Sequence, residues 1–416
     1  MRSTPHFDRV VFMQRCWLLA VPALVTFAAA ACGEPAPSAP GNVAGASGSG
    51  AGTTSVVPTA GSAGAATNTA GSTSVGTGGG GQGGATTQGG SSPVAGAGTG
   101  GAAPTAGSGG SAPIDGDTPP TRPLNAMNGA NEQINFTAKQ LDPMAGTSPT
   151  DTHAGAQQHG IVRTDRPLKG KLVMTLGGIG TCCGQGGIGG FAVGLGFHEM
   201  AIAMQTKISS APDEFKDVPE EQRTDEQNRQ MGDARMEAWD GVDRVSWLTI
   251  NEHDSFAYRA KLAINYMQEQ DPGGDWAYFL DAAGNVRWSD VYLVGYSYGS
   301  QTLAVVAKYV RIGRGIATSG PGNEGFPNAT WIKQESATPL DRMYGLWGSE
   351  NLSNYPETAT AAGWLGENIT VNGGASVADL MNGHKFILQG QGHSEFCAGD
   401  GGQWKAVCQH AFGVMQ

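Results

Sequence analysis

The sequence Gly-Tyr-Ser-Tyr-Gly at residues 295–299 places Ser297 between two glycines. An apolar run at residues 291–294 precedes it, and a helical pattern begins near residue 300. A serine that attacks a carbonyl has to project from a very tight turn. The positions two residues away on either side can then carry almost no side chain, which glycine provides. Strand, sharp turn and helix in this order predict that Ser297 is a nucleophile, and the alternative is an ordinary strand-to-helix turn.

A nucleophilic serine needs a general base, and His393 is the histidine best placed to supply one. Residues 385–389 predict a late strand, and His393 lies in the glycine-containing segment that follows it. His384 precedes the same strand and would therefore lie at the opposite edge of a sheet. The other histidines are interpreted as surface or packed residues or lie too near the C-terminus to be placed: His153, His159, His198, His253 and His410.

A carboxylate that orients the histidine is expected after the strand preceding His393 in the sheet. Residues 342–347 predict that strand, and Glu350 follows it, so Glu350 is the predicted acid. Asp379 falls in a predicted helix and Asp341 falls before the strand, so both fit less well, and Glu395 is a remote alternative.

Backbone amides that stabilise an oxyanion are expected from two loops. One donor is the residue after the nucleophile, Tyr298. The other is expected after an earlier strand at residues 172–176, where Gly178, Ile179 and Gly180 follow. Because glycine lets the backbone approach a developing alkoxide, the Ile179 amide is the predicted second donor.

The sequence predicts neither a cofactor nor a metal ion. Residues 184–189 match G-x-G-x-x-G, but they lie well beyond the strand, and no ribose-binding acid follows at the right distance. A chance match in a glycine-rich loop is the favoured interpretation. The pair His198-Glu199 lacks the second histidine of an H-E-x-x-H zinc motif.

The chain resembles the α/β-hydrolase family first named from a Burkholderia hypothetical protein. The segments that carry the resemblance are residues 255–262, 276–280, Trp288 and 295–299, and it extends from about residue 159 to the C-terminus. It implies an α/β-hydrolase fold, with a mostly parallel central sheet and helices on both faces. It also implies the order serine, acid, histidine along the chain, and it leaves the substrate open.

Three positions differ from the pattern of that family. Tyr296 stands where histidine is common before the serine, and residues 177–179 stand where a Pro-Gly-Thr type of loop is usual. Asn351 competes with Glu350 for the position of the acid, so the resemblance leaves the identity of the acid open.

The N-terminal residues predict export. Arg2, Arg9 and Arg15 precede an apolar run at residues 17–31, which is short for a membrane span and fits a secretory signal peptide over residues 1–31. The run ends in Ala-Ala-Ala-Cys-Gly, so Cys32 is the predicted lipidation site of a bacterial cell-envelope lipoprotein. The alternative is ordinary signal-peptidase cleavage nearby, which would release the protein.

Residues 32–120 predict a disordered tether, because residues 35–114 carry no charge and consist mainly of Gly, Ala, Ser, Thr and Pro. Residues 124–416 remain for one catalytic domain. The formal net charge of −11 argues against binding to a nucleic-acid backbone. The only predicted membrane contact is the lipid anchor.

Acidic residues concentrate at residues 213–243, after a strand predicted at residues 200–205. This composition predicts a small, solvated helical insertion, which would either cap the active site or be a plain surface excursion.

Four cysteines remain in the exported domain after Cys16 and Cys32 are set aside, and four cysteines allow three pairings. A bond between neighbouring cysteines is sterically awkward, so bridges that join the oxyanion loop to the histidine loop are favoured, and a local bridge between the last two is possible. The four are Cys182, Cys183, Cys397 and Cys408.

Together these features predict an exported serine hydrolase that cleaves a carboxylic ester, small or polymeric, through an acyl-enzyme. Amides and thioesters would use the same groups. The alternative from another class is a catalytically silent binding or cell-surface interaction module that kept the fold.

Overall fold

The computed structural model describes residues 120, 122–151, 153–183, 186–206, 215, 218–323, 325–380, 382–393 and 396–414. All of them belong to one compact unit, residues 100–416. The predicted signal peptide, Cys32 and almost all of the predicted tether lie outside the described residues, so these predictions stay predictions.

One nine-stranded sheet runs through the described residues, in the order β1-β2-β4-β3-β5-β6-β7-β9-β8. From β4 to β8 every neighbouring pair is parallel, whereas β1 and β2 join the β4 edge as antiparallel strands. The strands are β1 (Ile134–Phe136), β2 (Gln158–Ile161), β3 (Leu172–Leu176), β4 (His198–Ala201), β5 (Val291–Tyr296), β6 (Arg314–Thr318), β7 (Met343–Gly348), β8 (Asn368–Val371) and β9 (Lys385–Leu388).

Alternate residues of the central strands enter two different cores, which explains why the strands read as continuous apolar runs. In β5, Leu293 packs into the larger core and Val294 into the smaller one. In β7, Met343 and Leu346 divide between the two cores in the same way. Both faces of the sheet are therefore buried under helices.

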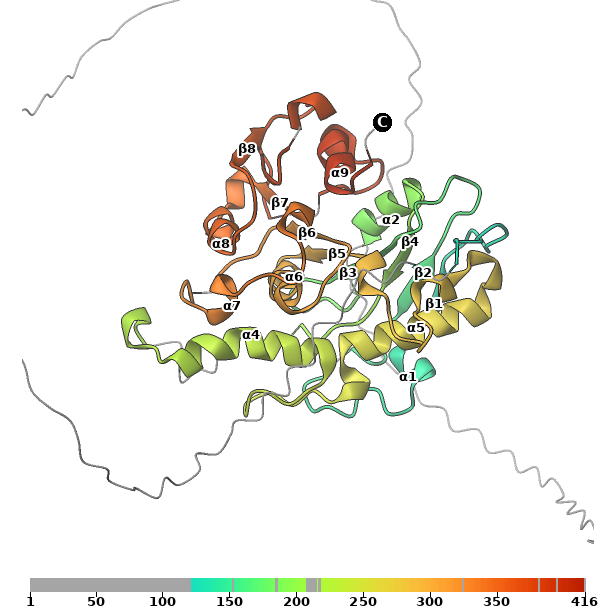
Figure 1. Cartoon of the computed structure of the whole chain (residues 1–416), viewed down its shortest axis with the longest axis horizontal. Coiled ribbons are helices and arrows are strands. Elements are labelled where there is room, and N and C mark those ends of the chain that lie inside the picture. Colours follow the sequence, from blue (N-terminus) through green and yellow to red (C-terminus); the bar gives the residue numbers. More distant parts are fainter. Residues whose placement is uncertain are drawn as a thin grey trace, which may run out of the picture. The chain divides into compact units, whose positions relative to one another are not determined.

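The helices form a layer on each face. The larger core contains residues of α4 to α8, and the smaller core contains residues of α2 and α9; Figure 1 shows α4 and α5 on one side of the sheet and α2 and α9 on the other. The described helices are α1 (Ala138–Leu141), α2 (Gly186–Gly194), α4 (Asp225–Asp240), α5 (Phe256–Gln270), α6 (Tyr298–Tyr309), α7 (Thr330–Lys333), α8 (Tyr355–Ala361) and α9 (Lys405–Ala411), with 3-10 turns between several of them. The predicted α/β-hydrolase fold is confirmed.

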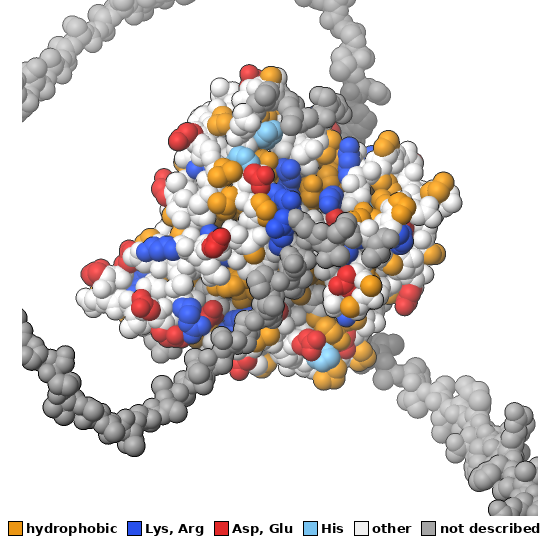
Figure 2. All heavy atoms as spheres, viewed as in Figure 1, with side chains coloured by type: hydrophobic (Ala, Val, Ile, Leu, Met, Phe, Trp, Pro, Cys, Tyr) orange, Lys and Arg blue, Asp and Glu red, His pale blue; other side chains and the backbone are white. Residues whose placement is uncertain are grey.

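Helix α4 corrects the prediction of a solvated insertion. Every residue from 231 to 239 is buried, and the helix packs against α6 and α7. Its charged residues misled the composition argument because several of them are paired or buried. Glu237, for example, is fully buried and accepts backbone N–H bonds from Arg244, Val245 and Ile250. The start of α4 presents an exposed ion pair between Arg229 and Glu226, and acidic and basic side chains are mixed on the face of the molecule in Figure 2.

Two element boundaries also differ from the sequence prediction. The strand expected at residues 200–205 is β4, which begins earlier and ends at Ala201. Helix α6 begins at Tyr298, directly after Ser297, and not near residue 300. The second shift matters because it places Ser297, the predicted nucleophile, immediately before the first turn of a helix.

The segment that enters the domain is fixed by Asp275. Arg122 donates to both carboxylate oxygens of Asp275, at 2.7 Å for Nη1, and the Asn125 amide donates to the same carboxylate at 2.6 Å. The carbonyl oxygen of the preceding residue, Gly274, lies 2.7 Å from Nε2 of His198, which is the first residue of β4. The chain therefore joins the domain at the edge where the parallel strands begin.

No helix in the described residues is both long enough and apolar enough to cross a membrane.

Lys308 gives the fold a distinctive pH dependence. Its side chain is 5% exposed, and its Nζ donates to the carbonyls of Gln334 and Ala362 without a carboxylate partner. Burial lowers the pKa of Lys308 to about 8. Because the folded-state pKa lies below that of the unfolded chain, the penalty of burying the charge is complete below pH 8 and disappears as the pH rises through about 10.5.

We therefore predict that the free energy of unfolding rises with pH across this window, by at most about 1.4 kcal/mol per pH unit from this group. Lys308→Met should flatten the rise, whereas Lys169→Met, at an exposed site, should leave it unchanged. Urea unfolding at pH 8, 9 and 10 measures the slopes. Equal slopes in both variants would contradict the assignment to Lys308.

Candidate active site

Ser297 lies in a strained turn at the carboxyl end of β5. Its φ is 51° and its ψ is −112°, and it is the N-cap of α6. A non-glycine residue rarely adopts a positive φ, and such strain persists only where the surroundings enforce it. The Ser297 amide donates to the Thr318 carbonyl at 2.9 Å, which ties the turn to the end of β6.

Both glycines of the motif are required by close backbone contacts. A Cβ atom on Gly295 would lie 2.5 Å from the carbonyl carbon of Gly299, and one on Gly299 would collide with the carbonyl of Leu176. The buried Ser300 hydroxyl donates to the carbonyls of Gly295 and Thr318, at 2.7 and 2.8 Å. The turn is therefore braced from the neighbouring strands on both sides.

The segment predicted to form the oxyanion loop lies beside this turn. The Thr181 amide donates to the Gly178 carbonyl at 3.1 Å, and Gly180 has a φ of +75°, as expected for the third residue of a type II turn. A Cβ atom on Gly178 would lie 3.6 Å from the Ser297 Cβ. The backbone of this turn thus reaches the nucleophile, and the Ile179 side chain is 63% exposed.

Tyr298 opens α6, and the first N–H groups of a helix have no acceptor inside the helix. Its position is fixed by Arg235 of α4, which packs against α6 on the same face of the sheet. The fully buried guanidinium lies 4.2 Å from the centre of the Tyr298 ring and donates to its hydroxyl at 3.1 Å. The helix N-terminus also favours negative charge at this point.

His393 follows β9, and the structure brings it to the residue before the nucleophile. The ring centres of Tyr296 and His393 are 5.2 Å apart, and the Tyr296 hydroxyl donates to the His393 carbonyl at 3.3 Å. Burial lowers the pKa of the His393 imidazole below its ordinary value. Among the described residues no hydrogen bond joins Ser297 to His393; in unliganded enzymes such bonds are often long and tighten with substrate.

The predicted acid lies in the expected loop, but its carboxylate does not reach the histidine. The Glu350 amide donates to the Gln391 carbonyl at 2.9 Å, and Gly348 packs against the same segment, so the loops after β7 and β9 are joined. The Glu350 side chain is exposed and makes no hydrogen bond within the described residues. The catalytic role of Glu350 stays a prediction.

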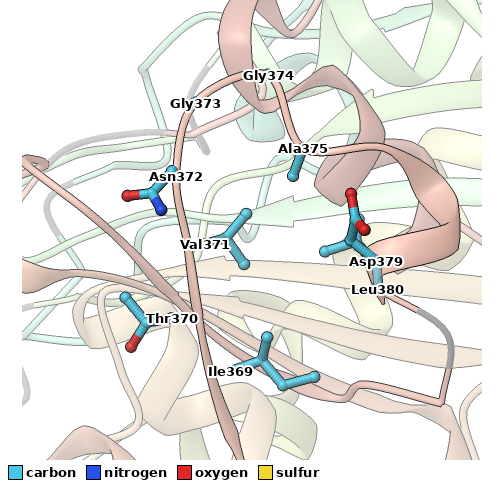
Figure 3. A pocket seen from close by; sticks show the side chains of 9 residues that line it. All are labelled: Ile369, Thr370, Val371, Asn372, Gly373, Gly374, Ala375, Asp379 and Leu380. Atoms are coloured by element: carbon cyan, nitrogen blue, oxygen red, sulfur yellow. The ribbon is translucent and has the colours of Figure 1, made fainter.

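The rival carboxylates are also placed elsewhere. Asp379 accepts bonds from the amide and hydroxyl of Ser376, at 2.9 and 2.7 Å. It lines a pocket of about 340 Å³ at the carboxyl end of β8, where Figure 3 shows its carboxylate beside the Ala375 side chain. Asp341 is exposed before β7, at the opposite edge of the sheet, and Glu395 lies outside the described residues.

Tyr355, the first residue of α8, is the contact that sequence reasoning missed. Its hydroxyl lies 3.5 Å from His393 Nδ1, the atom that a triad carboxylate would face. No motif marks Tyr355 in the sequence, because it lies far along the chain from both the serine and the histidine. An aromatic residue at a helix start is ordinarily interpreted as packing.

Other described histidines are paired or packed away from this turn, and His159 and His253 lie against the carboxylates of Glu199 and Asp142, at 3.2 and 2.5 Å. His384 stacks on Tyr344 with 4.7 Å between ring centres, and His198 lies buried against Trp276 and Phe279. Burial lowers the pKa of His198 to about 4. No cluster of metal-ligating side chains occurs in the part of the chain that the structure describes.

The cysteines lie in other pairs than the favoured ones, which would join the oxyanion loop to the histidine loop. Cys397 lies next to Cys408 of α9, with 5.6 Å between their Cα atoms, and Cys182 lies next to its neighbour Cys183. The cysteines therefore meet locally, because α9 folds back directly over the segment that follows His393. Bridges between the oxyanion loop and the histidine loop are not formed in this structure.

Comparisons with solved structures return hydrolases at low similarity. A feruloyl esterase module from Clostridium thermocellum, solved with sinapinate, is 12% identical, with 70% of this chain and 90% of that chain covered and a TM-score of 0.30. An S-formylglutathione hydrolase from Agrobacterium tumefaciens is 11% identical, with 70% and 97% covered and a TM-score of 0.32. A fluorophosphonate-binding serine hydrolase from Staphylococcus aureus is 12% identical, with 69% and 98% covered and a TM-score of 0.32.

No family model matches the chain, and no curated protein matches it. The resemblance to the family named from Burkholderia is therefore not confirmed. Because the TM-scores are low, we base the fold on the strand order and on the turn at Ser297.

We predict that Cys397 and Cys408 form a disulfide in protein isolated under oxidising conditions, because their Cα atoms lie 5.6 Å apart, within the range that a disulfide spans. Peptide mapping without reduction should find the peptides of Cys397 and Cys408 linked. Alkylation of the protein before any reduction is the control for scrambling. A peptide of Cys182 or Cys183 linked to either of the other two would restore the bridges between the loops.

Proposed function

We propose that the chain is a serine hydrolase that cleaves a carboxylic ester through an acyl-enzyme intermediate. The observation that carries the proposal is the positive φ of Ser297 at the carboxyl end of β5, directly before α6. Two contacts support it, because Tyr296, the residue before Ser297, contacts His393, and the backbone at Gly178 approaches the Ser297 side chain.

In the proposed mechanism the Ser297 oxygen attacks the substrate carbonyl while His393 Nε2 accepts the hydroxyl proton. The amides of Ile179 and Tyr298 stabilise the negative charge on the carbonyl oxygen. His393 then gives its proton to the leaving alcohol, and the acyl group stays on Ser297. A water molecule, deprotonated by His393, attacks the acyl-enzyme and releases the acid.

Two features bear on the role of the imidazole. Because the pKa of His393 is lowered, its imidazole is uncharged at pH 7 and can accept a proton. The exposed Glu350 is the carboxylate that the sequence assigns to this loop. The activity of Glu350→Gln measures its contribution to catalysis.

We further propose that the enzyme is an envelope lipoprotein anchored at Cys32. The junction at Arg122 and Asp275 supports a tethered arrangement, because it lies at the edge where the parallel strands begin. Ser297 lies at the edge where they end. A chain that enters at the first edge leaves the second edge open to substrate.

A fluorophosphonate probe separates the enzyme from a silent binding module. An activated serine is phosphonylated because the adduct mimics the tetrahedral intermediate, whereas an ordinary serine is inert. We predict stoichiometric labelling of Ser297, loss of labelling in Ser297→Ala and much slower labelling in His393→Ala. Intact-mass spectrometry and peptide mapping measure the adduct.

Ser336→Ala is the matched control, since Ser336 donates to the Ala307 carbonyl at 3.0 Å and lies away from the turn. It should label like the wild type. A folded wild-type domain that takes up no probe, or takes it up on another residue, would favour the binding module.

The anchor is tested in the bacterial cell. Because Cys32 ends an apolar run and precedes an uncharged tether, a labelled fatty acid should be incorporated into the wild type and not into Cys32→Ser. The Cys16→Ser variant, altered within the predicted signal peptide, is the control and should be labelled. Equal labelling of the wild type and Cys32→Ser would show that lipidation does not occur at Cys32.

A further inference from the structure

We propose that Tyr355, acting as a neutral hydroxyl in place of a carboxylate, is the residue that orients His393. The inference rests on the proposed function and concerns the third member of the catalytic set. Its basis is the contact between the Tyr355 hydroxyl and His393 Nδ1, 3.5 Å apart. Tyr355 does not touch the reacting atoms, so it is a positioning residue.

The Tyr355 hydroxyl contacts Nδ1 of His393, and a hydrogen bond at Nδ1 sets the tautomer and the orientation of the imidazole. When Nδ1 donates its proton to an acceptor, Nε2 is left as the free base that faces the serine. A tyrosine hydroxyl can accept this hydrogen bond as well as donate one. Burial, with a smaller contribution from Tyr296, raises the pKa of the Tyr355 hydroxyl, so it remains protonated and uncharged at neutral pH.

The Tyr355 ring is held firmly enough to position another group. The neighbouring Asn354 makes two hydrogen bonds with Asn323. Asn354 Nδ2 donates to Asn323 Oδ1 at 2.5 Å, and the backbone N–H of Asn323 donates to Asn354 Oδ1 at 3.3 Å. A Cβ atom on Gly322 would lie 3.4 Å from the Tyr355 ring. The start of α8 is thereby joined to the loop that follows β6.

Two tyrosines act on His393 in different ways. Tyr296 donates to the backbone carbonyl of His393, which fixes the loop, whereas Tyr355 contacts the ring nitrogen, which fixes the imidazole. The side chains of Tyr296 and Tyr355 are the titratable groups that contact His393 in the described residues, and Glu350 reaches this loop through its backbone amide. Partial burial of the ring, which stays exposed on its outer side, lowers the pKa of His393, and no carboxylate among the described residues raises it.

The arrangement has a consequence for catalysis. A carboxylate would stabilise the imidazolium that forms in the transition state, whereas a hydroxyl orients the ring with less stabilisation of the charge. The wild-type enzyme should therefore keep its base deprotonated to a lower pH than a triad with a carboxylate would.

Three variants test the proposal. Tyr355→Phe keeps the ring and removes the acceptor, so kcat should fall about 10- to 100-fold, the size expected for one hydrogen bond to a charged group, with KM within about twofold. Glu350→Gln tests the competing assignment, and if Tyr355 orients His393 the fall in kcat should be smaller in Glu350→Gln than in Tyr355→Phe. Tyr344→Phe is the matched control, because Tyr344 stacks on His384 at the opposite edge of the sheet.

Nitrogen-15 NMR of the His393 side chain provides a readout that needs no catalysis. The neutral imidazole should carry its proton on Nδ1 in the wild type and on a mixture of the two nitrogens in Tyr355→Phe. The acidic limb of kcat/KM against pH should lie below pH 6.5 in the wild type and still lower in Tyr355→Phe, which loses a bond that favours the imidazolium.

Two results would overturn the proposal: an unchanged tautomer in Tyr355→Phe, or a loss of several orders of magnitude in Glu350→Gln with Tyr355→Phe nearly unaffected. These outcomes differ from failure of the proposed function, which would appear as an unlabelled Ser297 in the wild type. In that case the NMR result still decides whether Tyr355 orients the ring.

Discussion

The sheet edge that carries Ser297 depends on how closely the backbone of β3 approaches the first turn of α6. The parallel register pairs Leu176 with Gly295, and the Leu176 carbonyl lies where any side chain on Gly299 would have to be. The chain can pass this point only through a sharp reversal, which leaves Ser297 with a positive φ. The same approach places the Gly178 turn next to the serine. One steric constraint thus positions both the nucleophile and the predicted oxyanion donors.

The sequence could predict this part of the molecule because the information is local. The apolar run of β5, the two glycines and the start of α6 are consecutive, and each follows from backbone sterics. His393 was also within reach, since a parallel sheet brings the ends of β5 and β9 to the same edge. The mostly parallel sheet was implied by the resemblance to an α/β-hydrolase family, and the strands of the structure are buried on both faces, as such a sheet requires.

The parts that escaped prediction depend on side-chain partners far away in the chain. Helix α4 has a polar composition, yet Glu237 is satisfied by three backbone amides and Arg235 by the ring and hydroxyl of Tyr298. Composition cannot reveal that such charges have partners. The cysteine pairing failed for a related reason, because the return of α9 over the segment after His393 is a tertiary event. The sequence also does not specify the direction of the Glu350 side chain, which is exposed in the structure, and the role of Glu350 as the acid stays a prediction.

The burial of α4 changes what the site can accept. A helix whose residues 231 to 239 are all buried, and which packs on α6 and α7, serves as a support beneath Tyr298 and not as a cap. Ile179 and His393, which flank the nucleophile from two loops, are exposed. In the proposed hydrolase, these exposed side chains would be within reach of a large or polymeric ester as well as of a small one. The exposure also explains why the contacts of His393 with Tyr296 and Tyr355 matter, since a ring at the surface has few other neighbours to fix its orientation.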